Sequence, residues 1–239
     1  MRVFLLIAGA GLAFSAGPAL AQANDPNVDA CVQKSGDEAI AGCTAAITSG
    51  KLNTGTLAAM YGDRGVEWAH KSDFARAITD YDESIRLNPQ DARMFYNRGK
   101  TYRDQGDEVR AIADYSEAIR INPKFSEAFL NRGNVYSGQK DRQRALEDYN
   151  EAIRLNPNDA DSHFARGDEY YLLADYSHAL ADLDEAIRLN PQYAKALYER
   201  GSIEAKRGEV ARSNADIAAA LQLDPDVAEK MPAVHSERG

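Results

Sequence analysis

Proline and glycine recur along this chain at one fixed interval. From residue 58 onward each repeat carries one glycine and one proline at equivalent places, and equivalent residues are always 34 positions apart. A period of this length predicts a stack of similar units that each pack against their neighbours, and it excludes a globule built around a single core. The recurring residues are Gly65, Gly99, Gly133, Gly167 and Gly201, with Pro89, Pro123, Pro157, Pro191 and Pro225.

The apolar residues within each repeat follow helical spacing. In the second repeat Phe95, Gly99 and Tyr102 lie at i, i+4 and i+7, and the second half shows the same pattern. An Asn-Pro pair ends each second half, or Asp-Pro in the last repeat, because the residue before proline is driven out of the helical region. Each repeat is therefore predicted as helix–turn–helix. Aspartates that can cap the second helices are Asp73, Asp107, Asp141 and Asp175.

These repeats resemble tetratricopeptide repeats. That family has large residues at repeat positions 4, 11 and 24, small ones at 8, 20 and 27, and proline at 32. With Ala58 as position 1, the third repeat has Phe129, Tyr136 and Tyr149 at the large positions and Gly133 at position 8. The resemblance implies an all-α fold, a right-handed superhelical solenoid of antiparallel helix pairs. Its five repeats are expected at 58–91, 92–125, 126–159, 160–193 and 194–227.

The fifth repeat departs from the pattern in a way that suggests a terminal cap. It carries Glu204 at position 11 and Asn214 at position 21, so a more polar outer face is expected. A terminal repeat has no further neighbour and needs a solvated face. Residues 228–239 are expected to form a loosely ordered tail.

The first residues have the layout of a secretory signal peptide. Arg2 precedes an apolar run over residues 3–14, and small-x-small patterns then allow cleavage after Ala21 or Ala23. The apolar run is shorter than the roughly 20 residues that a membrane-spanning helix needs. We therefore expect residues 1–21 to be a signal peptide and the protein to be exported, to the periplasm if the source is Gram-negative and outside the cell otherwise.

A shortened helical hairpin with two cysteines precedes the regular repeats. It is expected within residues 24–57, with a polar linker at 48–56. Cys31 and Cys43 would lie on facing helices. In an oxidising compartment this arrangement favours a disulfide over two free thiols, and the spacing is unlike that of a redox-active Cys-x-x-Cys pair.

Arginine and aspartate each keep one place in all five repeats. Position 7 is always arginine and position 23 is always aspartate, on the two helices of one hairpin. Because the acids recur in step with the arginines, we predict structural ion pairs. The alternative is an arginine row that binds an anionic ligand. The residues are Arg64, Arg98, Arg132, Arg166 and Arg200, with Asp80, Asp114, Asp148, Asp182 and Asp216.

Positions 2, 5, 6, 9, 12 and 13 share one face of the first helix in each repeat, which the resemblance places on a concave groove. This face is expected to bind peptide, the alternative being that its residues are merely solvated. Asn97 and Asn131 would form a two-rung asparagine ladder that grips peptide backbone. A carboxylate clamp is rejected, since only one of its five positions matches. The proposed groove residues are Arg93, Tyr96, Asn97, Lys100, Arg103, Asn131, Asn134, Phe164 and Tyr171.

Charge and motifs narrow the class of function. The 37 acidic side chains outnumber the 28 basic ones, and the net charge of −9 argues against nucleic acid or an anionic membrane as the main partner. The sequence has no nucleophile elbow, phosphate loop or zinc-protease motif, so no enzyme activity, cofactor or metal is expected.

The function predicted from these features is that of a non-enzymatic adaptor or scaffold of the cell envelope that binds an extended segment of another protein. Two alternatives stay open. One is a periplasmic holdase for translocating chains, and the other is an enzyme with an unrecognised site in the groove. No sequence pattern sets an oligomeric state.

Overall fold

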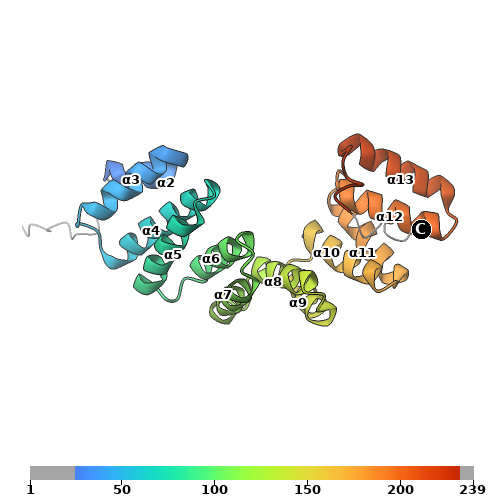
Figure 1. Cartoon of the computed structure of the whole chain (residues 1–239), viewed down its shortest axis with the longest axis horizontal. Coiled ribbons are helices and arrows are strands. Elements are labelled where there is room, and N and C mark those ends of the chain that lie inside the picture. Colours follow the sequence, from blue (N-terminus) through green and yellow to red (C-terminus); the bar gives the residue numbers. More distant parts are fainter. Residues whose placement is uncertain (1–24, 232–239) are drawn as a thin grey trace, which may run out of the picture. The chain divides into compact units, whose positions relative to one another are not determined.

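The computed structural model describes residues 25–231, and within that range it contains twelve α-helices and no strand (Figure 1). The predicted signal peptide, residues 1–21, and its cleavage positions lie outside the described residues. No helix in the described part of the chain is long and apolar enough to span a bilayer. The helices are α2 (Pro26–Gln33), α3 (Gly36–Thr48), α4 (Thr54–His70), α5 (Phe74–Leu87), α6 (Ala92–Asp104), α7 (Glu108–Ile121), α8 (Ser126–Gly138), α9 (Arg142–Leu155), α10 (Ala160–Leu172), α11 (Tyr176–Leu189), α12 (Ala194–Lys206) and α13 (Val210–Leu223).

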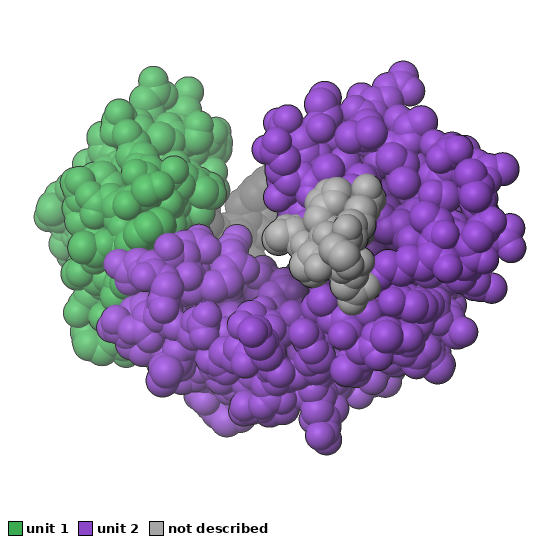
Figure 2. Space-filling view, turned by 45° about the vertical axis from the view of Figure 1, so that its right-hand side comes forward, with its two compact units in different colours: residues 1–89 green, residues 90–239 purple. Residues whose placement is uncertain are grey.

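The chain forms two compact units (Figure 2). Unit 1 covers residues 1–89 and contains α2 to α5, and unit 2 covers residues 90–239 and contains α6 to α13. Within each unit every helix packs against the next one along the chain. The division falls at the junction between the first and second predicted repeats.

The predicted helix starts are confirmed in four repeats. The Asp107 carboxylate accepts a hydrogen bond of 3.0 Å from the backbone N–H of Arg110 and caps α7. The same cap begins α5, α9 and α11, where Asp73, Asp141 and Asp175 supply the oxygen. Such a cap satisfies backbone donors that the first helical turn leaves free. The predicted ends are also confirmed, since α5, α7, α9 and α11 stop at the residue before an Asn-Pro pair.

Glycine at position 8 permits a close approach of the two helices in a hairpin. A Cβ atom added at Gly133 would lie 2.7 Å from Cε1 of the buried Tyr149 ring, far inside van der Waals contact. In the fourth repeat Leu183 replaces the tyrosine, and a Cβ atom at Gly167 would meet nothing nearer than 3.3 Å. In the fifth repeat a Cβ atom at Gly201 would lie 2.9 Å from Cγ1 of Ile217, so the glycine is required where a tyrosine or isoleucine faces it and less strictly in the fourth repeat.

All five predicted Arg–Asp pairs are brought together. In each repeat the arginine Nε and Nη2 atoms donate to the two carboxylate oxygens of the aspartate, with donor–acceptor distances of 2.7–2.8 Å. This two-point geometry fixes both partners. The structure therefore favours the structural role, because an anion bound to these guanidinium groups would have to displace the aspartates.

The same arginines also connect adjacent repeats. Nη1 of Arg132 donates to Oγ of Ser116 at 2.9 Å, and Ser116 belongs to the second helix of the preceding repeat. Equivalent bonds join Arg166 to Asn150 and Arg200 to Asp184, both at 2.7 Å. Each of these guanidinium groups therefore stabilises both its own hairpin and the contact with the preceding one.

Helices α2 and α3 form the shortened hairpin that precedes the first repeat. The Sγ atoms of Cys31 and Cys43 lie 1.99 Å apart, at bonding distance, and pack with Met60 of α4. The predicted linker is too long, because α4 begins at Thr54 and not at Ala58. The side-chain Oδ1 atom of Asn53 accepts from the N–H of Thr56 and caps α4, so the connection is confined to residues 49–53.

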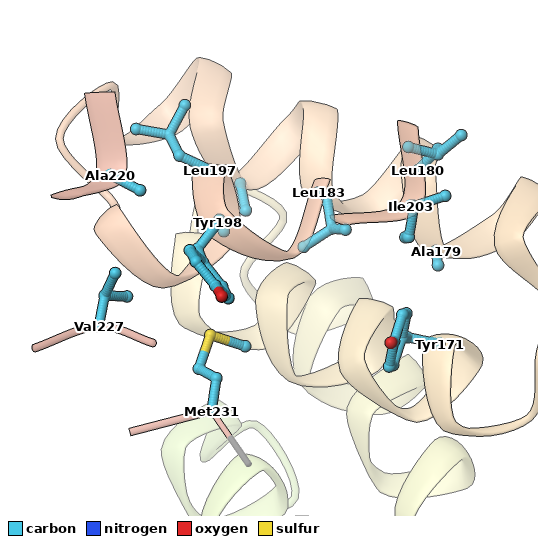
Figure 3. Packing of buried hydrophobic residues seen from close by; sticks show 12 residues of the cluster. Tyr171, Ala179, Leu180, Leu183, Leu197, Tyr198, Ile203, Ala220, Val227 and Met231 are labelled. Carbon is cyan, nitrogen blue, oxygen red and sulfur yellow. The ribbon is translucent and has the colours of Figure 1, made fainter. Parts of the chain in front are cut away.

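The start of the C-terminal segment is packed, which corrects the expectation of a loosely ordered tail from residue 228. Val227 is fully buried and Met231 is 7% exposed, in the same cluster as Leu197 and Tyr198. Figure 3 shows the Met231 side chain directed toward Tyr198. Residues 228–231 therefore cover the last helices, and the rest of the predicted tail lies outside the described residues.

The polar residues of the fifth repeat do not all face solvent. Glu204 was expected on a polar outer face, yet it is only 3% exposed. Its carboxylate lies 3.1 Å from Nη1 of Arg212 on α13. The large residue usual at position 11 is thus replaced by a buried carboxylate with a charged partner, which is how proteins accommodate a buried acid.

Candidate binding groove

The first helices of three consecutive repeats form a groove in unit 2. Helix α8 contacts both α6 and α10, so the equivalent faces of these three helices are neighbours. The hollow has a volume of about 490 Å³. Its lining residues are Tyr96, Lys100, Arg103, Leu130, Asn131, Asn134, Ser137, Tyr149, Asp161, Phe164, Ala165, Asp168 and Tyr193.

One end of the groove is basic. Lys100 is exposed and lies on the same helix as Arg103. Nη1 of Arg103 donates to Oδ1 of Asn131 at 2.6 Å, and its Nε and Nη2 donate to Asp104. The Arg103 side chain is thereby held in place while 34% of it stays exposed. Together Lys100 and Arg103 give this end a positive charge that attracts acidic groups.

Tyr96 lies next to the basic end and is supported by other aromatic rings. Its ring centroid is 4.8 Å from that of Phe125 and 5.9 Å from that of Tyr115. The Tyr96 hydroxyl accepts a hydrogen bond of 3.1 Å from Nδ2 of Asn131. Burial raises the pKa of Tyr96 above its ordinary value, which strengthens the preference of its phenol for the neutral form. Tyr96 therefore provides a fixed flat surface in the groove wall.

Aromatic and apolar side chains also line the groove. Leu130 comes from α8 and Phe164 from α10, and the Phe164 ring packs at 4.9 Å from the ring of Tyr193. The Tyr193 hydroxyl donates to the Asp161 carboxylate at 2.7 Å. Such surfaces bind apolar side chains with little loss of conformational freedom, because the rings are already held in place.

The other end of the groove is acidic. Asp161 and Asp168 on α10 line it, and the fully buried Glu199 of α12 lies next to Asp168. Burial and the neighbouring Glu169 carboxylate together raise the pKa of Asp168 to about 6, while the Arg142 guanidinium opposes the increase. Burial also raises the pKa of Glu199 well above its usual value, and the Asp168 carboxylate adds to that effect.

Six of the nine groove residues proposed from the sequence line this hollow: Tyr96, Lys100, Arg103, Asn131, Asn134 and Phe164. Arg93 does not line it, because its guanidinium group is held by Asp91, with Nη2 at 2.7 Å from Oδ2. Tyr171 is only 3% exposed and belongs to the core, where its hydroxyl accepts from Lys206.

The asparagine ladder is not formed as the sequence suggested. Asn97 does not line the hollow. The Asn131 amide is already occupied, since Nδ2 donates to Tyr96 and to the carbonyl oxygen of Glu127 while Oδ1 accepts from Arg103. Asn131 therefore orders the groove wall, and Asn134 likewise accepts a hydrogen bond of 2.9 Å from the Tyr149 hydroxyl.

Sequence reasoning missed several lining residues. Ser137, Asp161 and Ala165 occupy positions 12, 2 and 6, which are groove positions of the predicted face, so the spacing contained this signal. Tyr149 was assigned to the core, and it reaches the groove because its hydroxyl passes beside Gly133 to Asn134. Tyr193 lies in the turn before α12, where helix spacing gives no signal.

The groove is suited to binding an extended chain. Its two ends carry opposite charges, and its lining also includes aromatic rings and Leu130, so polar and apolar groups of a ligand can both be matched. Among residues 25–231 no group of three or more His, Cys, Asp or Glu side chains is placed to hold a metal ion.

The helix pairs define this protein as a helical-repeat protein. Residues 126–159 match one tetratricopeptide repeat model, and residues 71–124 and 164–228 match a second one. These matches cover more than half of the sequence. The chain belongs to the tetratricopeptide repeat family.

Comparison with solved structures shows the same fold. A crystal structure of MamA has 23% sequence identity and a TM-score of 0.61, with 69% of this chain and 96% of MamA covered. YrrB, described as a TPR protein with an unusual peptide-binding site, has 22% identity and a TM-score of 0.61 over 80% of this chain and 97% of YrrB. A tetratricopeptide repeat protein from Parabacteroides merdae has 18% identity and a TM-score of 0.64, with 82% and 80% covered. No curated protein sequence matches this chain significantly.

The family fixes the general class of function. Tetratricopeptide repeats are protein-interaction modules, so this fold is that of a scaffold for protein–protein interaction.

Proposed function

We propose that the groove of unit 2 binds an extended segment of one partner protein and that the chain acts as a non-enzymatic adaptor of the cell envelope. The observation that supports this most is the grouping of a basic end, fixed aromatic rings and an acidic end in one hollow. Peptide binding is also the property attributed to YrrB, which has the same fold.

The groove is ordered before a ligand arrives. Arg103, Asn131 and Tyr96 are joined by hydrogen bonds, and Phe164 and Tyr193 pack ring against ring. A site that is already ordered loses less conformational entropy when it binds. This favours selective binding of one segment over the adaptable surface expected of a holdase.

The location in the cell envelope rests on the sequence and on the cysteine pair. The signal-peptide pattern of residues 1–21 supports export, and the bonding distance between Cys31 and Cys43 suits an oxidising compartment. Both features point to a protein that functions after crossing a membrane.

Crosslinking in the native compartment tests the proposal. A photoreactive phenylalanine analogue at Leu130 places the crosslinker in the groove wall. We expect one dominant partner to be captured from this position, because the groove is selective. The matched control is the same analogue at Val109, an exposed residue of α7 in the same unit that does not line the groove.

The outcomes separate the candidate functions. One partner captured from Leu130 and absent from Val109 supports the adaptor. Capture of many unrelated unfolded chains from Leu130 indicates the holdase. Capture from Val109 alone, or equal capture from both positions, contradicts binding in the groove.

A further inference from the structure

Glu199 is a buried acid with no hydrogen-bond donor. Its side chain is fully buried, and neither carboxyl oxygen accepts from an N–H or hydroxyl donor among the described residues, so its polar neighbour is the carboxyl group of Asp168. A buried carboxyl group in this state is costly unless it is protonated or meets a positive charge. It forms no ion pair in the described part of the chain, unlike the buried Asp148 and Glu169, which are held by Arg132 and Arg142.

The place of Glu199 in its repeat directs it toward the groove. It occupies position 6 of α12, and the equivalent residues of α8 and α10 are Asn131 and Ala165, which both line the hollow. Its carboxyl group lies next to that of Asp168 and close to the phenol of Tyr193. Asp168 and Tyr193 both line the hollow. Glu199 is therefore directly behind the acidic end of the groove.

Asp168 presents the accessible carboxylate of this pair. No N–H donor among the described residues bonds to it, although Asn134, its equivalent in the preceding repeat, accepts a hydrogen bond from Tyr149. The groups that act on Asp168 are the Glu199 and Glu169 carboxyls, the Arg142 guanidinium and the Lys195 ammonium. Arg142 donates to Glu169 at 2.9 Å and is thereby already paired.

We propose that the acidic end of the groove receives a lysine or arginine side chain of the partner segment, which pairs with Asp168 in front of the buried Glu199. This inference rests on the proposed function and specifies the ligand. A carboxylate that faces the opening, with a second carboxyl group buried directly behind it, matches an ammonium or guanidinium group. The basic end at Lys100 and Arg103 then selects an acidic residue further along the segment, so the ligand carries both charges in a fixed order.

Binding of a cationic side chain at the acidic end should be coupled to the release of protons to the solvent. Burial raises the pKa of Glu199 well above its usual value and that of Asp168 to about 6, so this pair keeps a proton to a higher pH than exposed carboxyl groups do. An incoming cation favours the charged form of both acids and lowers both pKa values. Binding therefore releases protons, and the affinity for a cationic segment rises with pH.

The test uses the full chain and defined peptides. Each fluorescent probe has glutamate at one end, tyrosine and leucine in the middle and lysine at the other end, and it is made in both chain directions. A second set has norleucine in place of lysine. In the preferred chain direction, we expect the lysine peptide to bind about tenfold more tightly than the matching norleucine peptide, as one charge-assisted hydrogen bond allows. Asp168→Asn should abolish this preference, and Asn134 shows that asparagine is accommodated at this helix position.

Calorimetry in buffers of different ionisation enthalpy supplies a second readout. The lysine peptide should release protons on binding to the parent chain, and Glu199→Gln should reduce that release. Glu151→Gln makes the same substitution at an exposed position on α9 and should change neither result. If the lysine and norleucine peptides bind equally well, the acidic subsite is contradicted, while the proposed binding of peptide in the groove still stands. If none of the peptides binds, both the acidic subsite and the proposed binding of peptide in the groove are contradicted.

Discussion

Replacing Asp148 by alanine should lower the free energy of unfolding by about 3 kcal/mol. The Asp148 side chain is 7% exposed and accepts both hydrogen bonds of the Arg132 guanidinium, whose own side chain is 19% exposed. The substitution leaves a largely buried positive charge whose remaining hydrogen bond among the described residues is the one to the Ser116 hydroxyl. Denaturant unfolding followed by circular dichroism measures the change.

A double substitution separates the ion pair from simple loss of volume. Arg132→Met with Asp148→Leu should recover part of the lost stability, because no unpaired charge is left behind. Arg154→Ala breaks the exposed pair with Glu151 on α9 and should cost only about 0–1 kcal/mol. If the effects of the two single substitutions at Arg132 and Asp148 simply add, the pair does not act as one structural element.

Removing the bond between Cys31 and Cys43 should destabilise unit 1 by about 3 kcal/mol, since the closed loop restricts the unfolded chain. The cysteines are 12 positions apart and both are buried. The double substitution Cys31→Ala with Cys43→Ala should lower the midpoint of unfolding of the full chain. Addition of reductant to the parent chain should produce a similar shift.

Mass spectrometry of the exported chain tests the bond itself. After alkylation without reductant, the cysteines should carry no label, and after reduction they should carry two. Labelling of both thiols without reductant would contradict the disulfide and remove one of the two supports for an oxidising compartment.

The elements that could be predicted from sequence are those fixed by local chemistry. Asp107 and the Asn-Pro pairs set the helix ends through bonds to their own neighbours. The Arg–Asp pairs were predictable because both residues keep a constant place in each repeat. The groove face was largely predictable too, since α6, α8 and α10 present the same positions side by side.

The errors arose where a residue's partner comes from outside the repeat pattern. Tyr171 is buried against Lys206 of α12, and Arg93 is held by Asp91. Met231 lies beyond the last repeat, and the spacing cannot show that the chain turns back to the core. Asp168 occupies position 9 of the predicted groove face, but its pairing with Glu199 was missed, because the two carboxyl groups meet across two helices and no single-helix pattern brings them together.

The affinity of the segment captured from Leu130 for two charge-matched variants tests the central claim most directly. Lys100→Ala with Arg103→Ala removes both positive charges at the basic end of the groove. Arg120→Ala with Arg154→Ala removes two exposed charges from α7 and α9 in the same unit. We expect the first pair to weaken binding by at least about tenfold and to reduce its dependence on salt, and the second pair to leave both unchanged. Unchanged binding by the Lys100 and Arg103 variant, or weaker binding by the control, would show that the partner does not bind in this groove.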